Sequence, residues 1–269
     1  MTGSQIRTAG GSRGRGIDAI FGYARSHWQL GFHQPDPLYS LYSLYSLAKR
    51  MDRTPEPDLF TPTEEASEYH AMDHSGVNRQ FVDELLKGPT GPLVMDLGCG
   101  PAGIPIELCQ RSPEYEVIAT DGEVEMLEIA KGEIDIAGCL GQISLSHVQV
   151  ECMEAYEDGM ADTVISNSLL HHLDQPEKGL QTAVRLTRRG GRLFIRDLAR
   201  PENEETIEAL VTTYCREESE NGQQLFRQSL HAALTLNEIR SIARGLGIPE
   251  DHVQMTSDRH WTLDWCRPT

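Results

Sequence analysis

From residue 51 onward, apolar runs of strand length alternate with stretches of helical periodicity. The apolar runs lie at 92–98, 116–120, 143–150, 161–166 and 192–197. Helical spacing separates them, most clearly over 123–137 and 176–188. This alternation predicts a doubly wound α/β fold, because each crossover helix must pack on one face of a mostly parallel sheet. Helices on both faces are therefore expected.

The pattern changes after Pro201. Residues 202–232 read as one or two helices inserted before the sheet resumes, and Thr235 with Glu238 forms a capping box for a further helix. Two short strands follow at 252–256 and 259–265, with a tight turn between them. A C-terminal antiparallel hairpin at the edge of the sheet fits this spacing and brings the expected number of strands to seven.

Composition excludes several classes of protein. The chain has 24 Lys and Arg against 41 Asp and Glu, a formal net charge of −17, which disfavours a duplex nucleic-acid partner. No stretch approaches the roughly 18 apolar residues of a membrane span. The six cysteines form no C-x-x-C pair and no zinc spacing, so we expect reduced thiols in a cytoplasmic protein without a signal peptide. The sequence indicates no oligomeric state.

Residues 1–50 differ from the rest. They carry six Lys or Arg and two acids, a glycine-rich stretch at 10–16 and a threefold Leu-Tyr-Ser repeat at 38–46. No helical or strand period organises them, which predicts a poorly ordered basic extension. Two alternatives stay open: an organelle transit peptide, or translation that begins at Met51.

The chemistry is concentrated around the turn that follows the first strand. Gly98, Gly100 and Gly103 form G-x-G-x-x-G between a strand and a helix, and Asp121 ends the second strand. A carboxylate there can bind both hydroxyls of a ribose. Asp96 precedes the turn; it would oppose the pyrophosphate of a nicotinamide dinucleotide but suits the cationic methionine end of S-adenosylmethionine.

Four blocks carry a family resemblance: VMDLGCGPAG (94–103), VIATDGEVEMLEIAK (117–131), ADTVISNSLLHHL (161–173) and RRGGRLFIRDLARP (188–201). Together they resemble a class I S-adenosylmethionine-dependent methyltransferase, nearest to the small-molecule enzymes of ubiquinone and menaquinone biosynthesis. The resemblance implies S-adenosyl-L-methionine as cofactor, a small-molecule acceptor and direct in-line methyl transfer. Alternatives are another S-adenosylmethionine chemistry (a lyase or carboxymethyl transfer) and an RNA or protein methyltransferase.

Carried over by position, the resemblance assigns cofactor contacts. Asp96, Gly98 and Gly100 would line the methionine end and Asp121 the ribose, while Gly122 and Met126 would lie near the adenine. Asn167, after the fourth strand, matches the position that faces the methionine moiety. The family's adenine-binding Asp after strand three is missing; Glu151, or backbone groups of Cys152 or Met153, would replace it. Tyr69 lies in helices 63–87, expected to act as a lid.

Candidates for a general base lie on the acceptor side. His171 and His172 follow the fourth strand and Asp197 ends the fifth, at the edge where such sheets bind ligands. A structural role for the histidines stays open. The lid and the 202–232 insertion would wall the acceptor pocket, with Phe226, Leu230 and His231 on one helical face. Alternatively, the insertion helix packs only on the sheet or forms a dimer contact, and the lid segment is an exposed amphipathic helix. No metal is expected, since the Asp/Asp/Asn site of catechol-type methyltransferases is not evident.

Overall fold

The computed structural model describes residues 51–57 and 61–269. Contacts divide the chain into two units, Met1–Ala48 and Lys49–Thr269, and every element described below belongs to the second unit. The basic extension predicted at 1–50 lies outside the described residues.

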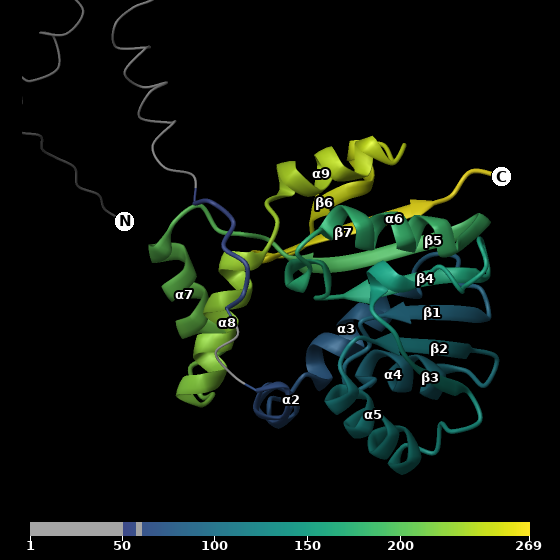
Figure 1. Ribbon diagram of the computed structural model, residues 1–269, viewed down its shortest axis with the longest axis horizontal. Helices are drawn as coiled ribbons and strands as arrows, with labels where there is room; N and C mark the ends of the chain where they lie inside the picture. Colours follow the sequence, from purple (N-terminus) through teal and green to yellow (C-terminus); the bar gives the residue numbers. More distant parts are fainter. Residues whose placement is uncertain (1–50, 58–60) are drawn as a thin grey trace, which may run out of the picture. The chain divides into compact units, whose positions relative to one another are not determined.

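A seven-stranded sheet forms the centre of the second unit, with the strand order β3-β2-β1-β4-β5-β7-β6 (Figure 1). Neighbouring strands from β3 through β5 pair in parallel, whereas β7 runs antiparallel to both β5 and β6. This confirms the predicted mostly parallel sheet with a C-terminal hairpin. The strands are β1 Leu93–Leu97, β2 Glu116–Asp121, β3 Ile143–His147, β4 Ala161–Asn167, β5 Thr187–Leu198, β6 Val253–Met255 and β7 His260–Cys266.

Helices precede, connect and follow these strands. Two of them begin with capping boxes, one at Thr61 with Glu64 and the predicted one at Thr235 with Glu238. The helices are α2 Pro62–Ala71, α3 Ser75–Leu85, α4 Gly103–Arg111, α5 Val124–Ile136, α6 Pro176–Leu186, α7 Glu204–Tyr214, α8 Glu220–Ala232 and α9 Leu236–Gly245. Three short 3-10 turns are η1 Val150–Cys152, η2 Leu170–His172 and η3 Glu250–His252.

Apolar clusters on the two faces of the sheet hold the layers together. On one face, α3, α4 and α5 pack on side chains from β1, β2 and β5. On the other, α6 and α9 cover the strands, and the fully buried Trp261 of β7 belongs to that cluster. The doubly wound arrangement is therefore confirmed (Figure 1).

The 202–232 insertion forms α7 and α8, which share a third apolar cluster with the end of β5. Leu230 is fully buried in this cluster, so the expectation that it faces an open acceptor pocket is wrong. Helix–helix packing within the insertion uses its side chain instead. Phe226 packs partly against the same cluster and His231 pairs with Glu204 of α7, so their role at the pocket stays a prediction. In Figure 1, α2, α7 and α8 gather at the end of the sheet toward which the parallel strands point.

Two strand boundaries differ from the predicted ones. β3 ends at His147, since residues 150–152 close into a 3-10 turn. β5 begins at Thr187, ahead of the predicted 192, and pairs with Ala161 before its register with β4 shifts. Gly191 permits this irregular pairing, because a Cβ there would lie 2.7 Å from the Asp162 carbonyl oxygen.

Candidate functional site

The turn after β1 is fixed against the end of β2. Backbone N–H groups of Gly98 and Cys99 both donate to the Thr120 carbonyl oxygen, each at 2.9 Å. Gly98 has a φ of +71°, and a Cβ added to it would meet Leu169 at 2.7 Å. Glycine is therefore required at this position by both conformation and space.

Asp121 stands at the end of β2 beside this turn. Its Oδ2 accepts the Gly100 N–H at 2.8 Å and its Oδ1 accepts the Glu123 N–H at 2.9 Å. Each carboxylate oxygen keeps further acceptor capacity, and the side chain is only half-buried. The carboxylate is thus held in place with room to accept the two hydroxyls of a ribose.

Asp96, one strand away, lies in a different environment. It is 2% exposed, and within the described residues its carboxylate has no hydrogen-bond donor; the Thr120 hydroxyl bonds to its backbone carbonyl. Burial, reinforced by the nearby charge of Asp121, raises the pKa of Asp96 to about 8. Since a buried carboxylate without a partner is costly, a cationic ligand group beside Asp96 would be strongly favoured.

Tyr69 of α2 lies beside the same turn. A Cβ added to Gly100 would be 3.9 Å from the Tyr69 ring, and that ring stacks on His74 with centroids 4.2 Å apart. Burial and the negative charges of Asp121 and Asp96 raise the pKa of Tyr69 to about 12. The α2–α3 junction thus lies over the glycine turn, while its opening and closing as a lid stays a prediction.

The residues predicted to contact the adenine through their backbone lie in and beside η1, and those contacts stay predictions. Met153 is 1% exposed and packs in the core against α6, and its carbonyl accepts from Arg185 Nη2 at 2.7 Å. Its side chain is therefore unavailable to a ligand. Cys152 is exposed on η1, and Gln149, which the sequence did not single out, packs beside Gly122.

Met126 and Asn167, the two remaining cofactor candidates, lie at the start of a helix and at the end of a strand. Met126 is half-buried in the first turn of α5, the helix that begins after Gly122 and Glu123. Asn167 is the half-buried last residue of β4, next to Ser168, which has a φ of +59° and donates its N–H to the Arg196 carbonyl. Both positions are compatible with the contacts that the resemblance implies, and those contacts stay predictions.

On the acceptor side, Asp197 is fully engaged within the protein. It is 1% exposed; its Oδ2 accepts the Leu170 N–H at 2.6 Å, and its Oδ1 accepts the Leu198 N–H at 2.7 Å and lies 2.5 Å from His171 Nδ1. Burial favours the neutral acid, but His171 and these donors outweigh it and lower the pKa of Asp197. Asp197 therefore orients His171 rather than acting as the base that the sequence suggested.

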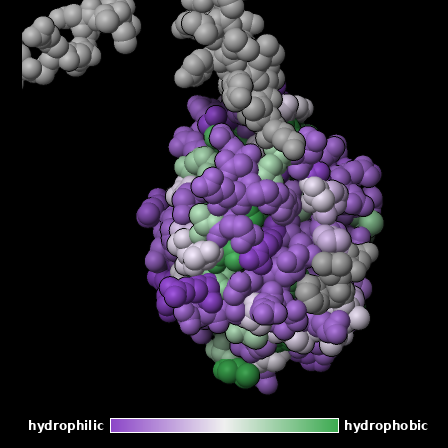
Figure 2. Space-filling view, turned by 90° about the vertical axis from the view of Figure 1, so that its left-hand side faces the viewer, coloured by the Kyte–Doolittle hydropathy of each residue, from purple (hydrophilic) through white to green (hydrophobic). Residues whose placement is uncertain are grey.

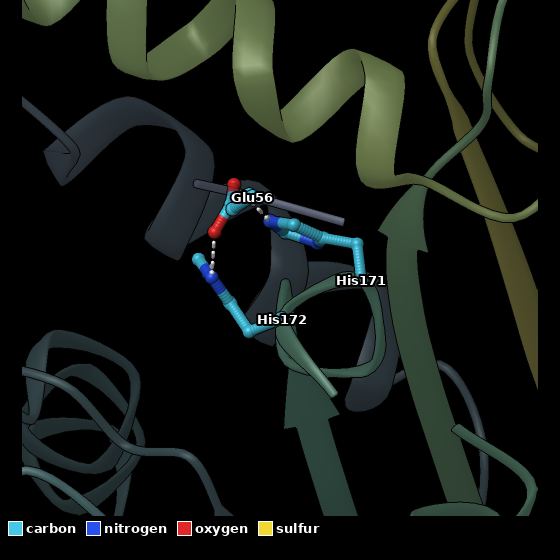
Figure 3. Close-up of side chains that lie close together, drawn as sticks. All are labelled: Glu56, His171 and His172. Carbon is cyan, nitrogen blue, oxygen red and sulfur yellow. Dashed lines mark hydrogen bonds and ion pairs between the residues drawn. The ribbon is translucent and has the colours of Figure 1, made fainter. Parts of the chain in front are cut away.

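Glu56, which sequence reasoning missed, joins the two histidines (Figure 3). Its Oε2 lies 2.5 Å from His172 Nδ1, its Oε1 accepts the Ser229 hydroxyl at 2.6 Å, and the same Oε1 is 3.9 Å from His171 Nε2. Burial opposes ionisation, but His172 above all lowers the pKa of Glu56 to about 2. Burial likewise favours neutral His172, yet Glu56 raises its pKa. Glu56 is thus a carboxylate at neutral pH.

Arg53 anchors the segment that carries Glu56. Its Nη2 donates to the carbonyl oxygens of His171 (2.9 Å) and Leu173 (2.7 Å), and its Nε donates to Ala232 at the end of α8 (2.6 Å). These bonds connect residues 51–57, the η2 turn and the insertion. No periodicity or motif in the sequence signals this contact.

The surface at this end of the sheet is mostly hydrophilic, with scattered hydrophobic residues (Figure 2). Among the described residues, no helix has the length and apolar character needed to cross a membrane. All six cysteines are free thiols, four of them buried.

Comparison with known proteins identifies the domain. A family profile described as a methyltransferase domain matches residues 95–195. The ubiquinone/menaquinone biosynthesis C-methyltransferase UbiE of Francisella tularensis subsp. novicida is 29% identical over 112 residues, 41% of this chain and 44% of that protein. The chain has a class I S-adenosylmethionine-dependent methyltransferase domain. The predicted family resemblance is confirmed.

Other relatives agree with this class of domain. The ubiquinone biosynthesis O-methyltransferase of Nitrosomonas europaea is 25% identical over 139 residues, 52% of this chain and 57% of that protein. The chain therefore spans about half the length of these curated relatives. A methyltransferase structure from Methanococcus maripaludis has a TM-score of 0.61 at 16% identity, covering 80% of this chain and 98% of its own, which shows the shared fold.

The profile match divides the site into two parts. The matched residues 95–195 of the methyltransferase domain contain the glycine turn, Asp96, Asp121 and the two adjacent histidines. Asp197, Glu56 and Ser229 lie outside the match. The predicted cofactor residues Asp96 and Asp121 are therefore within the part that matches the family profile, while the side chains of Asp197 and Glu56, which contact His171 and His172, lie outside the match.

Proposed function

We propose that this methyltransferase domain transfers the methyl group of S-adenosylmethionine to a small-molecule acceptor. One observation carries the proposal: the buried Asp96 carboxylate, without a protein donor, beside the glycine turn. The methionine end of S-adenosylmethionine brings an ammonium and a sulfonium, which would offset the cost of that buried charge. A pyrophosphate at the same place would increase it.

The proposed reaction is a direct in-line transfer. The sulfonium is already a strong electrophile, so the protein mainly aligns the acceptor and excludes water. Where the acceptor must lose a proton, His171 is the better-oriented base, because Asp197 fixes its Nδ1 and leaves Nε2 to face Glu56. His172, at 42% side-chain exposure, is the more accessible of the two histidines.

Charge and relatives support a small acceptor over a nucleic acid. A net charge of −17 repels phosphate backbones. The curated relatives are named for ubiquinone and menaquinone biosynthesis, and a solved relative at 17% identity, with a TM-score of 0.52, is a plantazolicin methyltransferase in complex with S-adenosylhomocysteine. These acceptors belong to the relatives. For this chain they support only the proposal that the acceptor is a small molecule.

Calorimetric titration of the full chain with S-adenosylmethionine, S-adenosylhomocysteine and NAD tests the cofactor. We expect the first two to bind and NAD to bind poorly, with weaker S-adenosylmethionine binding in Asp96→Asn and unchanged binding in the matched surface variant Asp158→Asn. Transfer is then tested with methyl-labelled cofactor and a small-metabolite extract, with the label expected in a small product. Tight NAD binding without S-adenosylmethionine binding would refute the assignment.

A further inference from the structure

We propose that Glu56, His171 and His172 form a binding site for one divalent transition-metal ion. Two imidazole nitrogens and a carboxylate oxygen, contributed by the 51–57 segment and the η2 turn, all lie within 4.8 Å of one another. Figure 3 shows the Glu56 carboxylate between the two imidazole rings, below α8. Two nitrogen ligands and one oxygen ligand suit Zn²⁺, Fe²⁺, Mn²⁺ or Co²⁺ better than Mg²⁺ or Ca²⁺.

The distances are close to those that a metal ion needs. Ligand atoms held about 2.1 Å from a tetrahedral ion lie about 3.4 Å from one another. Glu56 Oε2 and His172 Nδ1 are 2.5 Å apart, and Glu56 Oε1 and His171 Nε2 are 3.9 Å apart. An ion bound here would need His172 Nδ1 to move away from Glu56 and His171 Nε2 to move closer to it.

The surroundings of His171 provide a second, independent observation. Its Nδ1 lies 2.5 Å from the buried Asp197 carboxylate, so Nδ1 carries the proton and Nε2 is left to face Glu56. Carboxylate–histidine–metal arrangements orient ligand histidines in this way. The Ser229 hydroxyl similarly holds Glu56 Oε1, and Arg53 holds the His171 carbonyl.

Glu56 Oε1 and His171 Nε2 lie 3.9 Å apart, which is too long for a hydrogen bond and near the spacing of two ligands of one ion. The ion has a route in, since His172 is 42% exposed even though His171 is only 3% exposed.

Three protein ligands leave one coordination position open, as in catalytic metal sites. Resting on the proposed function, we assign that position to an acceptor oxygen, such as a hydroxyl, enolate or carboxylate. With the ion bound, His171 Nε2 is a ligand and not a base; the ion itself lowers the pKa of such a hydroxyl and orients it. The proposed site would therefore select acceptors that carry an oxygen donor near the atom to be methylated.

The test uses untagged full-length chain, stripped with a chelator and titrated with Co²⁺, whose visible d–d absorption reports nitrogen and oxygen ligation. Zn²⁺ then competes for the same site. We expect one ion per chain, with affinity about 100-fold lower in Glu56→Gln and in His172→Ala, and about 10–100-fold lower in Asp197→Asn. His252→Ala, at a histidine that precedes the edge strand β6 and bonds to the Asp264 carbonyl oxygen, is the matched control and should bind normally.

Glu56→Gln keeps a side chain that can bond to Ser229, and the His172 side chain is 42% exposed, so at least one of these variants should fold. The thermal melting temperature verifies folding. The metal site would be overturned if Co²⁺ binding did not saturate up to about 1 mM, or if Glu56→Gln, His172→Ala and the wild type bound Co²⁺ equally. The three side chains would then be held together by a shared proton and not by a metal ion. Methyl transfer unaffected by chelator would overturn the assignment of the open position to the acceptor while sparing the proposed function. Tight metal binding without any methyl transfer would spare the site and count against that function.

Discussion

The raised pKa of Asp96 predicts that cofactor binding releases a proton. In the free protein the pKa of this carboxyl is about 8, whereas beside the cationic end of S-adenosylmethionine the ionised form would be favoured. At about pH 6, two units below this pKa, Asp96 must lose its proton before the cofactor can bind. This costs about 2.7 kcal/mol of binding free energy, or about 100-fold in affinity. Affinity should rise toward pH 8 and then fall, because an α-amino group loses its own proton at about 7.7–8.0.

Calorimetry in buffers of different ionisation enthalpy measures this proton directly. At pH 7 we expect about 0.9 proton released for each S-adenosylmethionine bound, given a free pKa of about 8. Asp96→Asn should bind more weakly at pH 8 and show no proton release on the acid side, while Asp158→Asn should match the wild type. Equal proton release by wild type and Asp96→Asn, or wild-type affinity greatest at acid pH, would refute the reasoning.

The same group links stability to pH with a definite sign. The pKa of Asp96 is about 3.8 in the unfolded chain and about 8 in the folded chain. Between about pH 4 and pH 8 the unfolded state therefore binds fewer protons than the folded state. The contribution of Asp96 to the free energy of unfolding therefore falls as pH rises from about 4 to 8. Chemical denaturation of wild type and Asp96→Asn over this window would expose the difference, with Asp96→Asn relatively more stable at pH 8.

Three further outcomes are expected. Gly98→Ala should lower the free energy of unfolding by at least about 1–2 kcal/mol, measured by denaturant titration, because φ is +71° and Leu169 lies 2.7 Å from the added Cβ. A chain that begins at Met51 should bind cofactor and melt like the full chain. Removing residues 51–57 as well should lower the free energy of unfolding by about 2–4 kcal/mol, because the three hydrogen bonds of Arg53 are lost. Equal melting temperatures for the two truncated chains would contradict this. His171→Ala should lower methyl transfer at least about 100-fold in a turnover assay while sparing cofactor affinity, and near-normal turnover would remove it as the base.

The sequence predicts the sheet, and the meeting of Asp96, Asp121 and the glycine turn, because both depend on local patterns. Buried parallel strands appear as continuous apolar runs, and the glycine turn with Asp96 and Asp121 occupies two strand ends that the topology brings together. The adenine contact assigned to backbone groups of Met153 stays a prediction, since burial of its side chain against α6 does not test a backbone contact. Leu230 went wrong because one amphipathic face fits a pocket or a neighbouring helix equally well.

Glu56 could not be found from the sequence because its partner, His172, lies 116 residues away along the chain. Glu56 stands between two prolines in the 51–57 segment, which has no helical or strand periodicity. That segment, Asp197 and Ser229 all lie outside the matched residues 95–195, yet together they set the orientation and charge of the two histidines inside the match. The cofactor half is built on adjacent strand ends, so it can be shared by enzymes with different acceptors. The acceptor half depends on loops and insertions, where specificity commonly resides. A relative that shares residues 95–195 but lacks a carboxylate corresponding to Glu56 would therefore handle its acceptor differently, whatever its identity over the matched region.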